Sequence, residues 1–135
     1  MELADTSAWT NRDRDEAVRV AFDAELVAGD IATAPPIVME LLWSARDAAE
    51  FDGMRLELMS LPQLEVHRAA WDRAVEVWRD LVRRGRHRQV SRTDLVVAAV
   101  AELASVPVCH YDRDFEVIAE VTGQPMRAIA PLGTL

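Results

Sequence analysis

The alternation of short apolar segments with longer segments of helical periodicity is the feature that most constrains the fold of this chain. Short apolar runs lie at residues 1–5, 30–34, 106–111 and 126–130, and each has the length of a strand. Between them, apolar residues recur at spacings of three and four, which is typical of helices that bury one face. Strands that alternate with helices predict an α/β fold, with a mostly parallel central sheet of four to five strands flanked by helices. A chain of 135 residues is expected to form one domain, spanning 1–135.

The helical segments carry recognisable end signals. Gly29, Gly85 and Gly123 each follow an amphipathic segment, and glycine commonly ends a helix. Ser91 or Thr93 is expected to cap a helix. Gly53 is expected to interrupt the helical pattern that begins after the second apolar run. The expected helices lie within residues 13–30, 35–51, 54–61, 67–85, 91–104 and 112–123.

Composition excludes several classes of function. Half of the residues are hydrophobic, but no apolar run is long enough to span a bilayer, and no signal peptide opens the chain. The single cysteine, Cys109, excludes an internal disulfide and suits a reducing compartment, so we expect a cytoplasmic protein with no membrane contact. Glycine-rich phosphate loops and histidines at zinc-ligand spacing are both absent. The formal net charge of −8 argues against indiscriminate nucleic-acid binding.

Acidic residues follow the predicted strands or lie on the helices next to them. Sites in open α/β sheets form outside the carboxyl ends of the strands, so these acids are expected to converge on one pocket. Clustered carboxylates require a cation or raise one another's pKa, and ligand sets of oxygen alone suit Mg²⁺ or Mn²⁺. Such ions can activate water against a phosphodiester. The acids concerned are Asp5, Glu40, Asp94, Asp112 and Asp114.

Each acid also has a purely structural interpretation. Asp94 could cap or complement the N-terminus of a helix, Asp112 or Asp114 could cap the next one, and Asp5 could stabilise a turn. Glu40 is different because apolar residues flank it, so its carboxylate is expected to be paired or to bind a ligand. A shared pocket would account for all of these positions together.

Positive charge is concentrated in one stretch, residues 83–92, which holds five arginines and no acid. Without these five, the remaining 10 basic residues face 23 acidic ones, which leaves a charge of −13. The stretch lies directly before Asp94, so its arginines could hold phosphate groups beside the acidic pocket. The alternative is a basic loop that only meets solvent.

Four motifs in order resemble the PIN-domain ribonucleases, in particular the VapC toxins of VapBC toxin–antitoxin pairs. These motifs are "LADTSAW", "PPIVMELLWSA", "TDLVVAAVAE" and "HYDRDFEVIAE", and the resemblance covers essentially the whole chain. It implies a Mg²⁺-dependent endoribonuclease, with Mn²⁺ as a possible substitute, that cleaves RNA and is neutralised by a VapB-type antitoxin. It also implies a homodimer. The alternative is a PIN-fold RNA-binding or nuclease domain without an antitoxin partner.

The resemblance also implies roles for individual residues. Asp5 and Asp94 would be the principal metal ligands, and Thr6 and Asp114 would be a supporting hydroxyl and an additional acid. His110 departs from the family, because many relatives carry Ser or Thr two residues before the fourth acid. The implied catalytic acids are Asp5, Glu40, Asp94 and Asp112. The arginines expected to contact RNA are Arg86, Arg88 and Arg92.

Overall fold

The computed structural model describes all residues, 1–135, and has a four-stranded parallel sheet at its centre. The strands are β1 (Glu2–Ala4), β2 (Ile31–Ala32), β3 (Val108–His110) and β4 (Met126–Ala128), in the order β2-β1-β3-β4. The α/β fold and the parallel sheet predicted from the sequence are therefore confirmed. Because β1 and β3 are parallel neighbours, their carboxyl ends meet at the same edge of the sheet.

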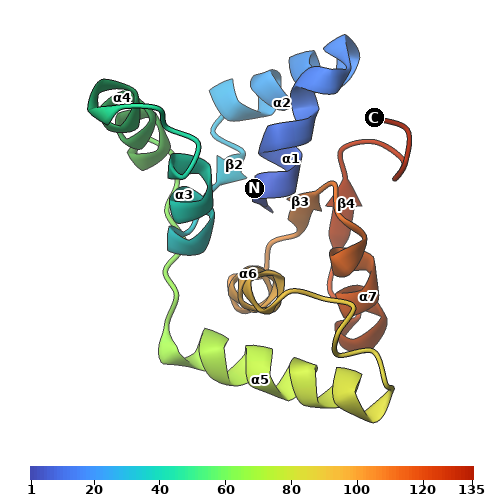
Figure 1. Cartoon of the computed structure of the whole chain (residues 1–135). Coiled ribbons are helices and arrows are strands. Elements are labelled where there is room, and N and C mark those ends of the chain that lie inside the picture. Colours follow the sequence, from blue (N-terminus) through green and yellow to red (C-terminus); the bar gives the residue numbers. More distant parts are fainter.

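Helices surround this sheet (Figure 1). In that view α1 and α2 lie above the strands, α3 and α4 to the left and α7 to the right, while α5 crosses below α6, which is seen end-on. None of these helices is long and apolar enough to span a membrane. Their bounds are α1 Thr6–Asn11, α2 Glu16–Val27, α3 Pro35–Leu42, α4 Ala48–Met59, α5 Arg68–Arg83, α6 Arg92–Leu103 and α7 Arg113–Thr122, with a 3₁₀ turn, η1, at Arg12–Arg14.

The two faces of the sheet pack into two hydrophobic clusters, because successive strand residues point to opposite sides. Leu3 and its partner Val108 pack with α3, α5, α6 and α7. Ala4 and its partner Cys109 pack on the other side, against Phe22 of α2. Helix α6 is central to the larger cluster, since every residue from 94 to 101 is buried. Burial of α6 between α5 and the sheet holds its first turn firmly at the edge where β1 and β3 end.

The structure corrects the prediction for residues 35–61. Instead of one helix that breaks at Gly53, α3 ends at Leu42 and α4 begins after Asp47. Asp47 caps α4 by accepting a hydrogen bond of 2.8 Å from the backbone N–H of Glu50. Gly53 lies within α4, where an exposed glycine costs about 1 kcal/mol relative to alanine and need not end the helix. Local capping at Asp47 therefore sets this boundary.

Helix α1 was not predicted from the sequence. The predicted helix ends at Ser91, Gly85 and Gly123 are confirmed. At six residues, α1 is too short to show an apolar periodicity. Ser91 caps α6, as expected, through its side-chain oxygen and the N–H of Asp94. Gly85 and Gly123 follow α5 and α7 with φ of 68° and 67°, a left-handed conformation that glycine adopts without strain.

Candidate active site

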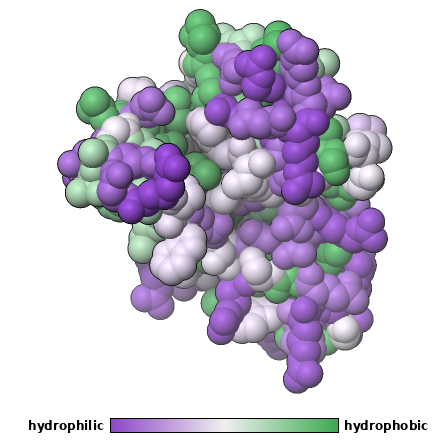
Figure 2. Space-filling model, turned by 45° about the horizontal axis from the view of Figure 1, so that its top comes forward, coloured by the Kyte–Doolittle hydropathy of each residue, from purple (hydrophilic) through white to green (hydrophobic).

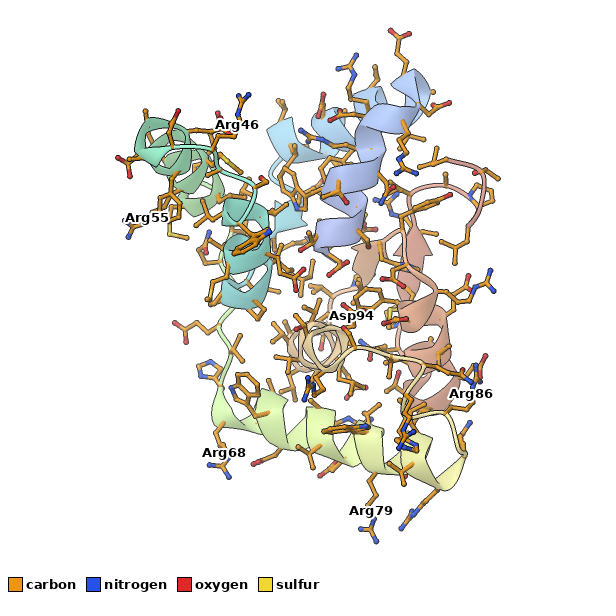
Figure 3. All side chains as sticks on the ribbon, viewed as in Figure 1. Arg46, Arg55, Arg68, Arg79, Arg86 and Asp94 are labelled. Atoms are coloured by element: carbon orange, nitrogen blue, oxygen red, sulfur yellow. The ribbon has the colours of Figure 1, made fainter.

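A polar cavity of about 530 Å³ opens at the carboxyl ends of β1 and β3. All five acids singled out from the sequence line it, as does Thr6. They come from the position after β1, from α3, from the first turn of α6, and from the N-cap and first turn of α7. In Figure 3, Asp94 lies at the centre of the molecule, on the upper side of α6, which is seen end-on. The full lining is Asp5, Thr6, Ser7, Thr10, Asn11, Glu40, Ser91, Thr93, Asp94, Tyr111, Asp112 and Asp114.

Asp5 is held in place by the strand before it and the helix after it. Its backbone N–H donates to Cys109 O at 2.9 Å, and its side chain is almost fully buried. Oδ2 of Asp5 accepts hydrogen bonds from Ser7 N–H at 2.9 Å and Ser7 Oγ at 2.6 Å, so Asp5 caps α1. Asp5 therefore both caps α1 and lines the cavity.

Ser7 is a site residue that the sequence analysis missed. While it donates to Asp5, its Oγ accepts a hydrogen bond of 2.9 Å from the backbone N–H of Tyr111, which directly follows β3. One hydroxyl thus connects the carboxyl ends of β1 and β3. The only local signal for Ser7 in the sequence is its place as the second hydroxyl residue after Asp5 in "DTS".

Asp112 and Asp114 are ordered by their position at the start of α7. Oδ1 of Asp112 accepts from the backbone N–H of Asp114 at 2.9 Å, so Asp112 is the helix cap. The backbone N–H of Asp112 donates in turn to Nδ1 of His110 at 3.2 Å. Burial lowers the pKa of His110, which keeps the ring neutral and able to accept this bond. His110 therefore supplies a hydrogen bond at the position where the resemblance led us to expect Ser or Thr.

Asp94 is not the cap of its helix, because Ser91 has that role. Ser91 Oγ accepts the N–H of Asp94 at 3.1 Å, and Ser91 N–H donates to Oδ2 of Asp114 at 2.8 Å. Asp114 thereby holds the start of α6 against the start of α7. The carboxylate of Asp94 is only 8 % exposed and lines the cavity.

The carboxylates of the cavity repel one another and are poorly solvated. Burial above all, together with a hydrogen bond to Asp114 and the charge of Asp5, raises the pKa of Asp94 to about 9. Burial is also the main reason that the pKa of Asp112 is raised above its usual range. Without a cation, protons neutralise part of this charge, so the site favours the binding of a positive group.

The donor set fits a divalent metal ion. One carboxylate oxygen from each of Asp94, Asp112 and Asp114 lies within 4.8 Å of the other two. Asp5 lies in the same cavity but not in this group of three. Thr6 Oγ1 is buried without any hydrogen-bond partner, an atom that a water beside a bound ion would satisfy. Hard ions such as Mg²⁺ prefer such oxygen donors.

Glu40 lies in the wall of the cavity, yet the reason given for its importance was wrong. It is exposed on α3, and its neighbour Met39 is 73 % exposed. The apolar flanks in the sequence therefore do not bury this carboxylate, and no ion pair neutralises it. Glu40 still lines the cavity, and its role as a catalytic acid remains a prediction.

The three arginines expected to contact RNA differ in their surroundings. Arg86 forms an ion pair with Glu120 of α7 and a hydrogen bond of 3.0 Å to Gln89. Figure 3 shows it beside α7 at the margin of the molecule, far from Asp94 in that view. Arg88 and Arg92 are exposed, and neither makes an ion pair. None of the three lines the acidic cavity itself, so their contact with RNA remains a prediction.

Comparison with protein families and curated proteins gives a consistent result. The family model described as "PIN domain" matches residues 3–121. Ribonuclease VapC18 of Mycobacterium tuberculosis is 39% identical over 133 residues, which cover 97% of this chain and 96% of that protein. Ribonuclease VapC51 of the same species is 36% identical over 134 residues, covering 98% and 96% of the two chains.

Solved structures share the fold. The DNA-bound VapBC of Salmonella typhimurium superposes with a TM-score of 0.74 at 19% identity, covering 96% of this chain and 100% of that one. VapBC-5 of Mycobacterium tuberculosis superposes with a TM-score of 0.59 at 23% identity, covering 94% and 95% of the two chains. At these identities the likeness concerns the fold alone.

Proposed function

Because the chain belongs to the PIN-domain family, we propose that it is a metal-dependent endoribonuclease, the toxin of a VapBC-type toxin–antitoxin pair, and that residues 1–135 form a single PIN domain. The observation that carries this proposal is the convergence of five carboxylates on one cavity at the carboxyl edge of the sheet. Such a cavity does not stabilise the fold, because the charges within it repel one another. It suits a divalent ion and the phosphodiester that the ion acts on.

In this mechanism Asp94, Asp112 and Asp114 would hold the metal, and Asp5, which lines the same cavity, would be a further ligand. Mg²⁺ is the proposed ion, with Mn²⁺ as a substitute, and when bound it lowers the pKa of water and stabilises charge on the leaving oxygen. The raised pKa of Asp94 falls when a cation shares its charge, so this carboxylate becomes available as a ligand at neutral pH.

The remaining residues of the cavity position water and substrate. Glu40 is exposed on the wall formed by α3, where its carboxylate can accept a proton from an attacking water. Thr6 Oγ1, which has no partner within the protein, can orient that water by a hydrogen bond. Ser7 holds Asp5 in position, and His110 does the same for the backbone of Asp112.

The proposed partner is a VapB-type antitoxin, because relatives of the same fold are solved as VapBC complexes. An excess of carboxylates suits a basic side chain, and an arginine can bind two carboxylate oxygens where the metal would otherwise lie. We further propose that the toxin forms a homodimer and acts in the cytoplasm, where its RNA substrate is found. The neighbouring gene and co-purification with its product test the pairing directly.

Cleavage of total RNA by the purified chain tests the nuclease assignment. We expect cleavage with millimolar Mg²⁺, no cleavage with EDTA, and no cleavage by a folded Asp94→Asn variant. The matched control is Asp47→Asn, which changes a carboxylate that caps α4 outside the cavity and should leave cleavage intact. A wild-type chain that binds RNA but never cleaves it would instead identify a non-catalytic PIN-fold binding module.

A further inference from the structure

We propose that the hollow between Trp71 and Arg92, next to the acidic cavity, is a nucleobase-stacking subsite. An unstacked base of single-stranded RNA lies against the indole of Trp71, while the guanidinium of Arg92 holds the phosphate beside that base. The inference rests on the proposed ribonuclease function and specifies its substrate further, as RNA with at least one unpaired base next to the cleaved bond.

The hollow adjoins the acidic cavity. It measures about 160 Å³ and is lined by Pro36, Trp71, Arg92, Thr93 and Val96. Thr93 lines the acidic cavity as well, so the two spaces adjoin at that residue. A strand with its phosphodiester among the carboxylates would therefore place a neighbouring nucleotide against Trp71.

A second hollow of about 170 Å³ extends the first one along α5. It shares Trp71, Arg92 and Val96 with the first, and its other lining residues are Ala74, Val75, Trp78 and Leu95. Together the two hollows form a path of apolar side chains that starts beside the acidic cavity. An aromatic base can slide over such a surface, because stacking requires no fixed hydrogen-bond pattern.

Trp71 differs from the other tryptophan of α5. Trp78 packs against the main hydrophobic cluster. Trp71 lies in the first turn of the helix with 52 % of its surface exposed, and it is not part of the hydrophobic clusters. Its indole is therefore available to a ligand, and indole faces are common stacking platforms for the bases of single-stranded nucleic acids.

The charge of the path favours RNA over an apolar segment of protein. Arg92 is the only charged residue that lines either hollow, and no carboxylate lies within 4.0 Å of its guanidinium. Eight of the 15 arginines, in contrast, form ion pairs. An unpaired cation beside an exposed aromatic ring matches a phosphate beside a base.

Most of the face shown in Figure 2 is hydrophilic, with apolar side chains only in small groups. The net charge of −8 repels RNA from most of the surface. Arg92, which has no carboxylate partner, can therefore attract a phosphate. Because Arg92 and Thr93 line the same hollow, this charge lies beside the proposed position of the reacting bond.

The test compares two oligomers of equal length, oligo(A) and an oligomer whose nucleotides all lack their bases. Both carry the same phosphates, and only oligo(A) can stack. Binding is measured in the Asp94→Asn background, so that nothing is cut. We expect Trp71→Ala to weaken binding of oligo(A) about 5- to 150-fold, the usual range for one stacked base, and to leave binding of the baseless oligomer unchanged. Trp71→Phe should retain most of the affinity, which separates stacking from a failure to fold.

Two further variants complete the experiment. Arg92→Ala should weaken binding of both oligomers and make the slope of log affinity against log salt shallower by about 0.7. The matched control is Trp43→Ala, since Trp43 is 90% exposed on the surface but lines neither hollow. Quenching of tryptophan fluorescence by oligo(A) should be reduced by Trp71→Phe and retained in the Trp43 variant.

The outcomes separate this inference from the proposed function. If wild-type protein cleaves RNA but Trp71→Ala binds oligo(A) as tightly as the parent, the subsite is wrong and the nuclease assignment stands. If Trp71→Ala only disrupts a dimer, as sedimentation would show, the hollow belongs to a protein interface and the subsite is again wrong. A wild-type chain that neither binds nor cleaves RNA overturns both proposals.

Discussion

Ser7 Oγ lies 2.6 Å from Oδ2 of Asp5 and donates a hydrogen bond to it. The same oxygen accepts the N–H of Tyr111 at 2.9 Å, across 104 positions of sequence. Asp5 directly follows β1 and Tyr111 directly follows β3, so this hydroxyl fixes the spacing of two strand ends that carry acids of the cavity. We therefore expect it to affect catalysis by fixing the position of Asp5.

Replacing Ser7 by alanine should lower both the rate of RNA cleavage and the free energy of unfolding. The change leaves the N–H of Tyr111 without its acceptor and Asp5 without one donor, which costs about 1–3 kcal/mol of unfolding free energy. We expect kcat for RNA cleavage to fall at least tenfold, because Asp5 loses its fixed orientation. Ser7→Thr keeps the hydroxyl and should restore part of the activity. Ser60→Ala is the control, since Ser60 lies outside the cavity and its Oγ donates only to the backbone carbonyl of Glu57. Equal kcat values in the Ser7→Ala and Ser60→Ala variants would contradict this role.

The metal-free protein should lose stability as the pH rises from about 4 towards 9. The pKa of Asp94 is about 9 in the folded chain and near 3.9 when unfolded, so in this window the folded state binds more protons. Unfolding free energy then decreases with increasing pH. Asp94→Asn removes this contribution, so its stability should exceed that of the wild type by a margin that grows with pH.

Mg²⁺ should reverse this effect, because the ion takes the place of the protons. Thermal melts at pH 5 and pH 8, with EDTA or millimolar Mg²⁺, provide the measurement. We expect the increase in Tm on adding Mg²⁺ to be larger at pH 8, and to be absent in Asp94→Asn. A melting temperature that is indifferent to Mg²⁺ at both pH values would count against a metal site at these acids.

His110 should contribute a pH dependence of the opposite sign. Burial lowers its pKa below the usual 6.5, so below that pH the unfolded state binds more protons and folding becomes less favourable. The unfolding free energy of the wild type should therefore decrease relative to that of His110→Asn as the pH falls from 7 to 5.

The hydrogen bond of His110 is tested by a second variant. Asparagine can still accept the N–H of Asp112, whereas His110→Leu leaves that N–H unpaired at a cost of about 1–3 kcal/mol. If the leucine variant is as stable and active as the asparagine variant, the hydrogen bond to Asp112 has no importance.

Within the basic stretch, Arg86 should behave differently from Arg88 and Arg92. Because Arg86 is paired with Glu120, Arg86→Ala should lower stability by at most about 1 kcal/mol, and Glu120→Gln should have a similar effect. Arg88→Ala and Arg92→Ala should leave stability unchanged and each reduce the salt slope of RNA binding by about 0.7. A salt titration with Asp94→Asn protein tests this. If the Arg86→Ala single variant changes the salt slope of RNA binding, Arg86 must leave Glu120 to bind phosphate.

Local patterns in the sequence were sufficient to predict most of the elements and the place of the acids. Apolar runs followed by acids predicted β1 and β3 and the positions of Asp5 and Asp112. Helix caps depend on residues three apart or fewer, so Ser91 could be identified as well. The same locality explains the errors, since Asp47 as a competing cap was overlooked and α1 is too short to show periodicity.

The contacts that order the site depended on tertiary structure. The bonds of Ser7 to Tyr111 and of Asp114 to Ser91, and the ion pair of Arg86 with Glu120, join residues between 23 and 104 positions apart. Such pairs meet only after the register of β1 against β3 and the packing of α6 against α7 are set by burial of both faces of the sheet. Sequence by itself thus determined which side chains stand at the strand ends. The three-dimensional packing decided which of them are buried together, because pKa values and hydrogen bonds respond to distance in space and not along the chain.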